Sequence, residues 1–176
     1  SEEGRAVPYA ERRAWKRFWL VDPLDGTKEF IHRNGEFTVN IALVADRRPV
    51  LGVIYVPVAD RLYWAAPGMG ARLLEECRRA SALGFDPAAA GRRLPLPPGD
   101  PRPYTVVGSR RHGAPRLEAF IEEARRRRGE VEVMTAGRAL KFGLVAEGRA
   151  DAYPRTRPTL DWDTAARPAL AQAAGR

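Results

Sequence analysis

The sequence predicts an α/β protein in which an antiparallel meander of strands is followed by a mixed or parallel sheet with helices. Before residue 67, short apolar segments follow one another with turn residues between them, which is typical of hairpins. After residue 103, short apolar segments alternate with longer helix-like ones, which favours parallel strands. Prolines interrupt both patterns at Pro95, Pro97, Pro98, Pro101 and Pro103. We therefore expect two parts, residues 1–100 and residues 101–176.

The first part is expected to form a series of strands after a polar helix or loop at about residues 7–17. These strands span Phe18–Val21, Phe37–Val44, Val50–Val56 and Arg61–Ala66. The turn residues Asp46-Arg47-Arg48-Pro49 join the second strand to the third as a hairpin. Between Met69 and Pro103 the pattern breaks down, and we interpret this stretch as a domain seam or a long crossover.

The second part is expected to alternate strands with helices. Strands are predicted at Tyr104–Val107, Val131–Met134 and, in a shorter form, Asp151–Tyr153. Helices are predicted at about Pro115–Arg127 and Ala139–Glu147, with a last helix after Asp163. Such an alternation places helices over the faces of a sheet that contains parallel strands.

Composition indicates a folded domain with a basic surface. The chain has 176 residues, 44% of them hydrophobic, which is enough for a genuine core. Its net charge of +8 is compatible with nucleic-acid binding, and it would also help to attract an anionic substrate. The run Arg125-Arg126-Arg127-Arg128 follows an amphipathic segment. We interpret this run as a solvated helix end and expect no specific nucleic-acid partner.

Cysteine use and hydropathy bear on the compartment. Cys77 is the single cysteine, so no internal disulfide can form, and a reducing compartment is plausible. The sequence shows neither an apolar stretch of membrane-spanning length nor a signal peptide. We therefore expect a cytoplasmic protein without a membrane span, for which peripheral association with the inner membrane stays open. The oligomeric state is left open.

Two aspartates stand where the first strand ends. Pro23 fixes its own φ and biases Asp22 away from helix, so Asp22 and Asp25 can converge on one point. The carbonyl of Leu24 can face the same way, which gives three hard oxygen ligands of the type that Mg²⁺ prefers. Gly26 lets the backbone approach a ligand, and Thr27 is predicted to cap the segment 28–31, whose N–H groups would face an anion.

An isolated Asp-Gly pair is most often an ordinary turn, but the surrounding string is more specific. Asp22-Pro23-Leu24-Asp25-Gly26-Thr27, preceded by Glu2-Glu3 and followed far away by Asp161-Trp162-Asp163-Thr164-Ala165-Ala166, resembles the signature of the inositol monophosphatase superfamily. Lys28-Glu29-Phe30, where inositol monophosphatases usually carry Thr-Asn-Phe, is similar to the CysQ branch of 3'(2'),5'-bisphosphate nucleotidases. The resemblance implies a layered αβαβα sandwich. It also implies that the chain is an internal fragment without the family's N-terminal helices and C-terminal end.

The resemblance implies a site for two or three Mg²⁺ ions and a nucleotide. Metal ligands would be Glu2, Asp22, Asp25, Asp163 and the carbonyl of Leu24, with Glu3 positioning Glu2. Glu2, Asp25 and Thr27 would be catalytic, with Thr27 orienting the attacking water. Substrate contacts would come from Gly26, Thr27, Ser109, His112, Gly137, Lys141, Tyr153 and Arg155. The implied reaction is hydrolysis of adenosine 3',5'-bisphosphate (PAP) to AMP and phosphate, and the sulfated nucleotide PAPS is a second candidate substrate.

The chain departs from the CysQ pattern at two places. Thr135-Ala136-Gly137-Arg138 stands where relatives often have Gly-Ser-Ser, and Arg167-Pro168 stands where they have Gly-His. Pro168 would cost about 3 kcal/mol if the last helix began at Asp163, so this helix either begins later or is distorted. Three readings of function therefore stay open. They are a bisphosphate nucleotidase, a phosphatase acting on inositol 1-phosphate or fructose 1,6-bisphosphate, and a non-catalytic nucleotide- or RNA-binding remnant.

Overall fold

The computed structural model describes residues 4, 7–84, 86, 89–108, 115–136, 138–154 and 165–175, with the side chains of residues 138–140 left aside. Its larger sheet is six-stranded and antiparallel, with neighbouring strands in chain order. These strands are β1 (Arg17–Asp25), β2 (Thr38–Ala45), β3 (Arg48–Val56), β4 (Arg61–Ala66), β5 (Gly70–Glu75) and β6 (Arg92–Arg93). The short helices α1 (Tyr9–Arg12), α2 (Thr27–Ile31) and α3 (Cys77–Ala82) accompany them. The predicted antiparallel meander is therefore confirmed.

The hairpin between β2 and β3 follows directly from the sequence. Every second residue of β2 is buried, as the alternation of side chains across a sheet requires. Asp46 and Arg47 form the turn with φ of 48° and 63°, the conformation at both central residues of the tight turns that suit hairpins. The predicted hairpin is confirmed, although its turn is shorter than expected, because Arg48 and Pro49 already belong to β3.

Two predictions about the first part are corrected. The stretch from Met69 to Pro103 contains β5, α3 and β6, so it continues the sheet for much of its length. The signal was weak because only Ala71 and Leu73 of β5 are buried and α3 has no buried residue. The strand predicted to end at Val21 continues as β1 to Asp25, with an irregularity in its pairing between Asp22 and Asp25.

The second part contains a small parallel sheet. Strands β7 (Tyr104–Gly108) and β8 (Val131–Thr135) pair in parallel, and α4 (Pro115–Arg128) lies between them in the chain. Ala152 adds a single parallel bridge to Val106, where a short strand was expected. The predictions of β7, β8 and α4 are confirmed, whereas the strand predicted at Asp151–Tyr153 is reduced to this single bridge. A separate apolar cluster that includes Val106, Leu117 and Val131 holds this unit together.

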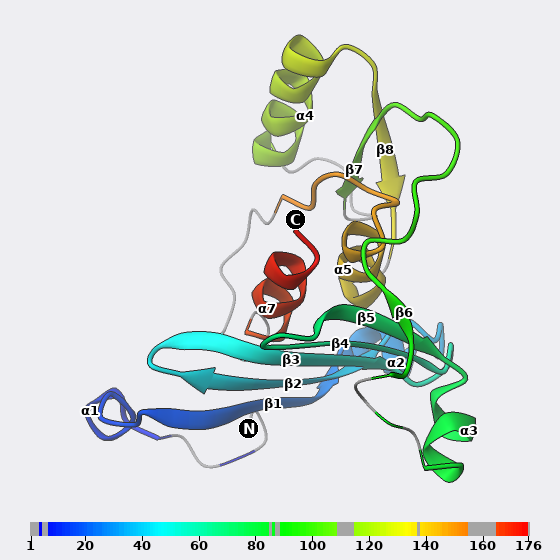
Figure 1. Ribbon diagram of the computed structural model, residues 1–176. Coiled ribbons are helices and arrows are strands. Elements are labelled where there is room, and N and C mark those ends of the chain that lie inside the picture. Colours follow the sequence, from blue (N-terminus) through cyan, green and yellow to red (C-terminus); the bar gives the residue numbers. More distant parts are fainter. Residues whose placement is uncertain are drawn as a thin grey trace.

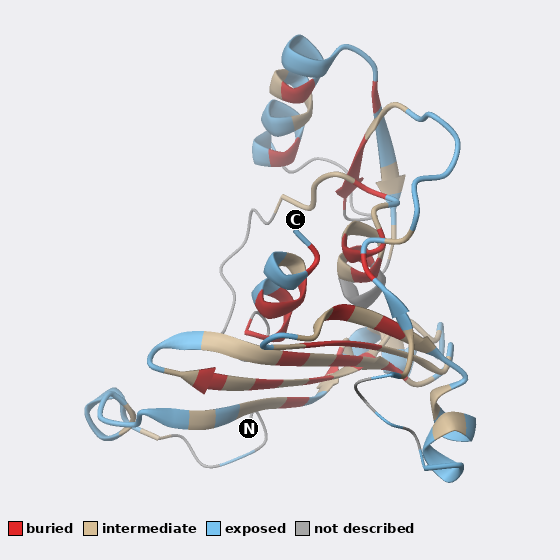
Figure 2. Cartoon of the chain, in the orientation of Figure 1, coloured by how far each residue is buried: buried red, intermediate tan, exposed pale blue. Residues whose placement is uncertain are grey.

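Helices α5 (Arg138–Ala146) and α7 (Ala166–Ala173) lie over one face of the large sheet, and the small sheet and α4 lie beyond them (Figure 1). Figure 2 shows that the buried residues gather where the central strands meet α7 and α5. Gly52 on β3 permits this contact, because a Cβ atom there would lie 2.3 Å from the Ala166 carbonyl oxygen. The close approach fixes where the first turn of α7 meets the sheet.

The described start of α7 resolves the question of Pro168. The helix begins at Ala166, so Pro168 is its third residue, among the first positions whose N–H groups have no partner within the helix. Proline at that position removes no intrahelical hydrogen bond, and of the two alternatives, a later start or a distorted end, the later start is observed. Within the described ranges, no helix is long and apolar enough to cross a membrane.

Candidate active site

The two aspartates of the Asp-Pro-Leu-Asp string are both buried at the end of β1. Asp22 is 1% exposed and Asp25 is 3% exposed. The N–H of Leu24 donates a hydrogen bond to Asp22 Oδ1 over 3.1 Å, which holds that carboxylate toward the turn. The pairing irregularity between the two aspartates lets both carboxylates be buried although they are three positions apart. The structure thus buries both of the carboxylates that the sequence predicted to converge.

Strand β2 supplies the polar surroundings of these carboxylates. Asn40 lies opposite Asp22 in the sheet and Thr38 lies opposite Asp25. Asn40 Nδ2 donates to Asp25 Oδ2 over 3.2 Å. Asn40 Oδ1 and Thr38 Oγ1 are buried, and neither has a hydrogen-bond partner among the described residues. Buried oxygen atoms without a hydrogen-bond partner are unfavourable, and a further polar group or a cation beside them would remove that cost.

Arg167 is the residue that sequence reasoning did not place in this site. It lies in the first turn of α7, is 2% exposed, and its Nη2 donates to the same Oδ2 of Asp25 that accepts from Asn40. The pair joins residues that are 142 positions apart in the chain. The only sequence signal was its departure from the Gly-His of relatives, because a single arginine gives no indication of its partner.

The donor set fits a hard divalent cation. Two carboxylates and the two unsatisfied oxygens of β2 are the oxygen ligands that Mg²⁺ favours. The described residues alone contain no group of three or more His, Cys, Asp or Glu side chains that could hold a metal ion. The predicted ligands Glu2 and Asp163, and the supporting Glu3, lie outside the described residues.

The turn at Gly26 and Thr27 differs from the prediction in one respect. Gly26 occupies the N-cap position of α2 with φ of 100°, and no side chain caps the helix. Thr27 is therefore the first helical residue, and its predicted role as the cap is wrong. Glycine is required at the cap because its backbone is left-handed, a conformation that other residues adopt at a cost. The Thr27 side chain is thus left for another role.

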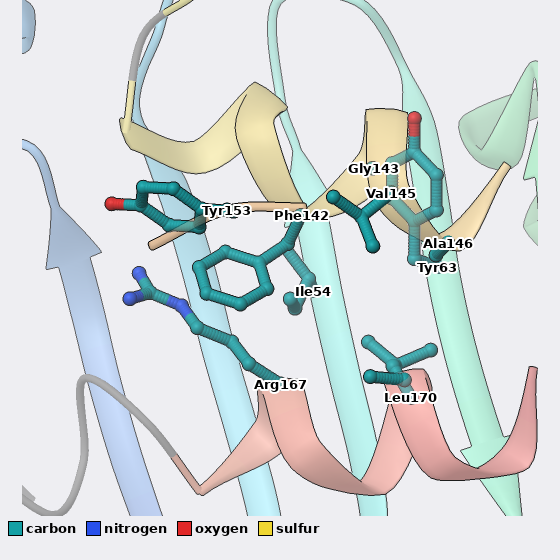
Figure 3. Close-up of a pocket in the computed structure, with 10 residues that line it drawn as sticks. Ile54, Tyr63, Phe142, Gly143, Val145, Ala146, Tyr153, Arg167 and Leu170 are labelled. Atoms are coloured by element: carbon teal, nitrogen blue, oxygen red, sulfur yellow. The ribbon is translucent and has the colours of Figure 1, made fainter. Parts of the chain in front are cut away.

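An aromatic and cationic array continues from Arg167 to two predicted substrate contacts. The Arg167 Cζ lies 4.5 Å from the centroid of the Phe142 ring, which contacts Tyr153 edge to face at 4.8 Å. Lys141, which is buried, places its Nζ 5.1 Å from the centroid of the Tyr153 ring. Figure 3 shows Arg167 reaching from α7 toward Phe142 and Tyr153. The structure therefore connects Asp25 to Lys141 and Tyr153.

These side chains border a cavity of about 180 Å³. Its walls are mostly apolar and include Ile54 of β3, Leu170 of α7 and Val145 of α5. Arg167 and Tyr153 of the array also line this space, and Figure 3 shows the guanidinium and the tyrosine hydroxyl on the same side of it. The remaining predicted substrate contacts, Ser109, His112, Gly137 and Arg155, lie outside the described residues.

Comparison with known proteins agrees with this arrangement. The chain belongs to the inositol monophosphatase family, whose model matches residues 1–176. Within that family, it is 49% identical over 164 residues to the 3'(2'),5'-bisphosphate nucleotidase CysQ of Salmonella typhimurium, which covers 93% of this chain and 59% of the relative. The CysQ of Escherichia coli K12 is 48% identical with the same coverage. The chain thus spans about three-fifths of the length of these relatives.

Solved structures extend the comparison to the fold. CysQ from Bacteroides thetaiotaomicron, described as a bacterial member of the inositol monophosphatase family, has a TM-score of 0.86 and 47% identity, and the match covers 99% of this chain and 65% of that one. SuhB from Mycobacterium tuberculosis has a TM-score of 0.67 and 25% identity, covering 93% and 62%. The predicted family resemblance is confirmed, and the described fold matches that of this family.

Proposed function

We propose that the complete protein is a metal-dependent phosphomonoesterase that hydrolyses adenosine 3',5'-bisphosphate to AMP and phosphate. The observation that carries the proposal is the pair of buried carboxylates, Asp22 and Asp25, at the end of β1. Burying two acids three residues apart is unfavourable unless cations or hydrogen-bond donors compensate them. Relatives that are 48–49% identical over 93% of the chain are bisphosphate nucleotidases, which supports the nucleotide as substrate.

Metal binding would use residues from three parts of the sequence. Asp22, Asp25 and the Leu24 carbonyl would hold two or three Mg²⁺ ions together with Glu2 and Asp163, and Glu3 would position Glu2. Ions bound there would lower the pKa of a water molecule and neutralise charge on the phosphoryl group. Asn40 would orient the Asp25 carboxylate through the hydrogen bond that it already makes.

The remaining residues would hold water and substrate. Thr27, which caps no helix, would orient the attacking water, and the backbone at Gly26 would approach the phosphate. The ammonium of Lys141 would pair with a phosphate and Tyr153 would contact the base. Ser109, His112, Gly137 and Arg155 would complete the substrate site. The complete protein would then form the layered αβαβα sandwich, and the single cysteine of these 176 residues suits the cytoplasm.

Phosphate release by the complete protein tests this proposal. PAP, PAPS, inositol 1-phosphate and fructose 1,6-bisphosphate are compared side by side, each with Mg²⁺ and with excess chelator. We expect PAP to be hydrolysed fastest and the chelator to abolish release. Faster hydrolysis of inositol 1-phosphate would contradict the substrate. Salt-sensitive RNA binding without any Mg²⁺-dependent phosphate release would contradict the enzymatic proposal as a whole.

A further inference from the structure

Asp25 already has a cationic partner within the protein. The guanidinium of Arg167 donates to Asp25 Oδ2, and both side chains are almost fully buried. An arginine remains protonated under all ordinary conditions, so its positive charge cannot be removed by loss of a proton. A divalent cation bound to Asp25 would therefore lie close to a like charge in a poorly solvated site, where such repulsion is strong.

The backbone next to Arg167 is constrained on both sides. Ala166, the residue before it, contacts Gly52 of β3 so closely that no Cβ atom fits between them. Pro168 follows directly and restricts the chain on the other side. We therefore expect a separation of Arg167 from Asp25 to come from rotation of the arginine side chain.

The side chain of Arg167 has a neighbour other than Asp25 and open space beside it. The guanidinium already lies over the face of Phe142, and Arg167, Phe142 and Tyr153 together border the cavity of about 180 Å³. An arginine over an aromatic face keeps part of its stabilisation through the attraction of the cation to the ring. The side chain can thus leave Asp25 and remain in contact with Phe142.

We infer that Arg167 is a built-in competitor of the divalent cation at Asp25, and that metal binding there moves its guanidinium away from Asp25 while the side chain stays against Phe142. This inference rests on the proposed metal site. It predicts that the chain binds divalent cations more weakly than it would with a neutral residue at 167.

Binding of Mn²⁺ to the complete protein, without substrate, tests the inference. Free Mn²⁺ is counted by electron paramagnetic resonance for the unmodified protein, Arg167→Gln and Arg92→Gln. Arg92 lies on β6 and is largely exposed, so Arg92→Gln removes the same charge far from Asp25. We expect the Kd for Mn²⁺ to fall about tenfold or more in Arg167→Gln and to stay unchanged in the control.

The outcomes separate the inference from the proposed function. Equal Mn²⁺ affinity in the unmodified protein and Arg167→Gln would overturn the inference and leave the metal site intact. No Mn²⁺ binding in either would overturn the metal site itself, and the inference with it. Should Arg167→Gln not fold, nuclear magnetic resonance of the unmodified protein decides. The Arg167 Nε–H signal is expected to shift on addition of Mg²⁺, and an unchanged signal would overturn the inference.

Discussion

Two buried carboxylates of this protein, Asp25 and Glu147, have different surroundings. Glu147, directly after α5, accepts a 2.5 Å hydrogen bond from the Tyr63 hydroxyl and lies 3.3 Å from Arg61 Nη1. Both partners are on β4, so this carboxylate ties a helix end to the sheet. Asp25 instead lies at a strand end beside unsatisfied oxygens of β2, with its cation supplied by a distant helix. Burial alone therefore does not distinguish these two acids, whereas the unsatisfied oxygens beside Asp25 do.

The comparison is tested most severely by removing the charge of Asp25. In Asp25→Asn we expect phosphate release by the complete protein to fall about 10³-fold or more, because the metal site loses a negative ligand. The exposed Asp100→Asn is the matched control and should keep full activity. Rates are expressed per folded molecule, which circular dichroism determines. A loss of less than tenfold in the rate of phosphate release would indicate that Asp25, like Glu147, has a structural role.

Removing the Glu147 carboxylate should lower stability and leave activity nearly unchanged. Glu147→Ala leaves the Tyr63 hydroxyl and the Arg61 guanidinium without their buried acceptor, which should lower the free energy of unfolding by about 3 kcal/mol. The activity of the molecules that remain folded should change little. Glu130→Ala, at an exposed position, should change stability by less than about 0.5 kcal/mol. Denaturant unfolding measures both, and equal stabilities would contradict the role given to Glu147.

The close packing of α7 on β3 positions Arg167, the partner of Asp25. Gly52→Ala places a methyl group against the Ala166 carbonyl and should cost about 2 kcal/mol of stability. Because Arg167 follows Ala166, the variant should also alter Mn²⁺ affinity. Gly99→Ala, where a Cβ atom meets nothing within 4 Å, should do neither. An unchanged stability in Gly52→Ala would show that α7 can move away from the sheet at little cost.

The smallest expected effect concerns Tyr63 at high pH. Burial, and then the nearby Glu147 carboxylate, raise the pKa of Tyr63 well above its ordinary value of 10.0. Above pH 10 the unfolded chain loses this proton while the folded protein keeps it, so stability falls as pH rises. Tyr63→Phe should cost about 1 kcal/mol at pH 7 and make the decline above pH 10 less steep. Unfolding curves at pH 7 and 10.5 test this, and an identical decline in both proteins would contradict it.

The sequence predicted the elements whose patterns are local. The strands of the meander and α4 follow from alternation and amphipathic spacing, so their positions were right to within a few residues. The strand β5 was missed because its buried face consists of only Ala71 and Leu73. Asp22 and Asp25 were found because their string is specific. Their association with Arg167 was not, since no local pattern connects residues 142 positions apart.

The position of the helix that covers the sheet has a consequence for synthesis of the chain. The strands β1–β5 are complete at residue 75, but the apolar side chains of α7 that pack on them follow about ninety residues later. At a ribosomal rate of about 5–20 residues per second, α7 would be synthesised several seconds after β5. During that interval its uncovered face is a natural target for chaperones, whereas the compact β7–α4–β8 unit can close on itself as it emerges.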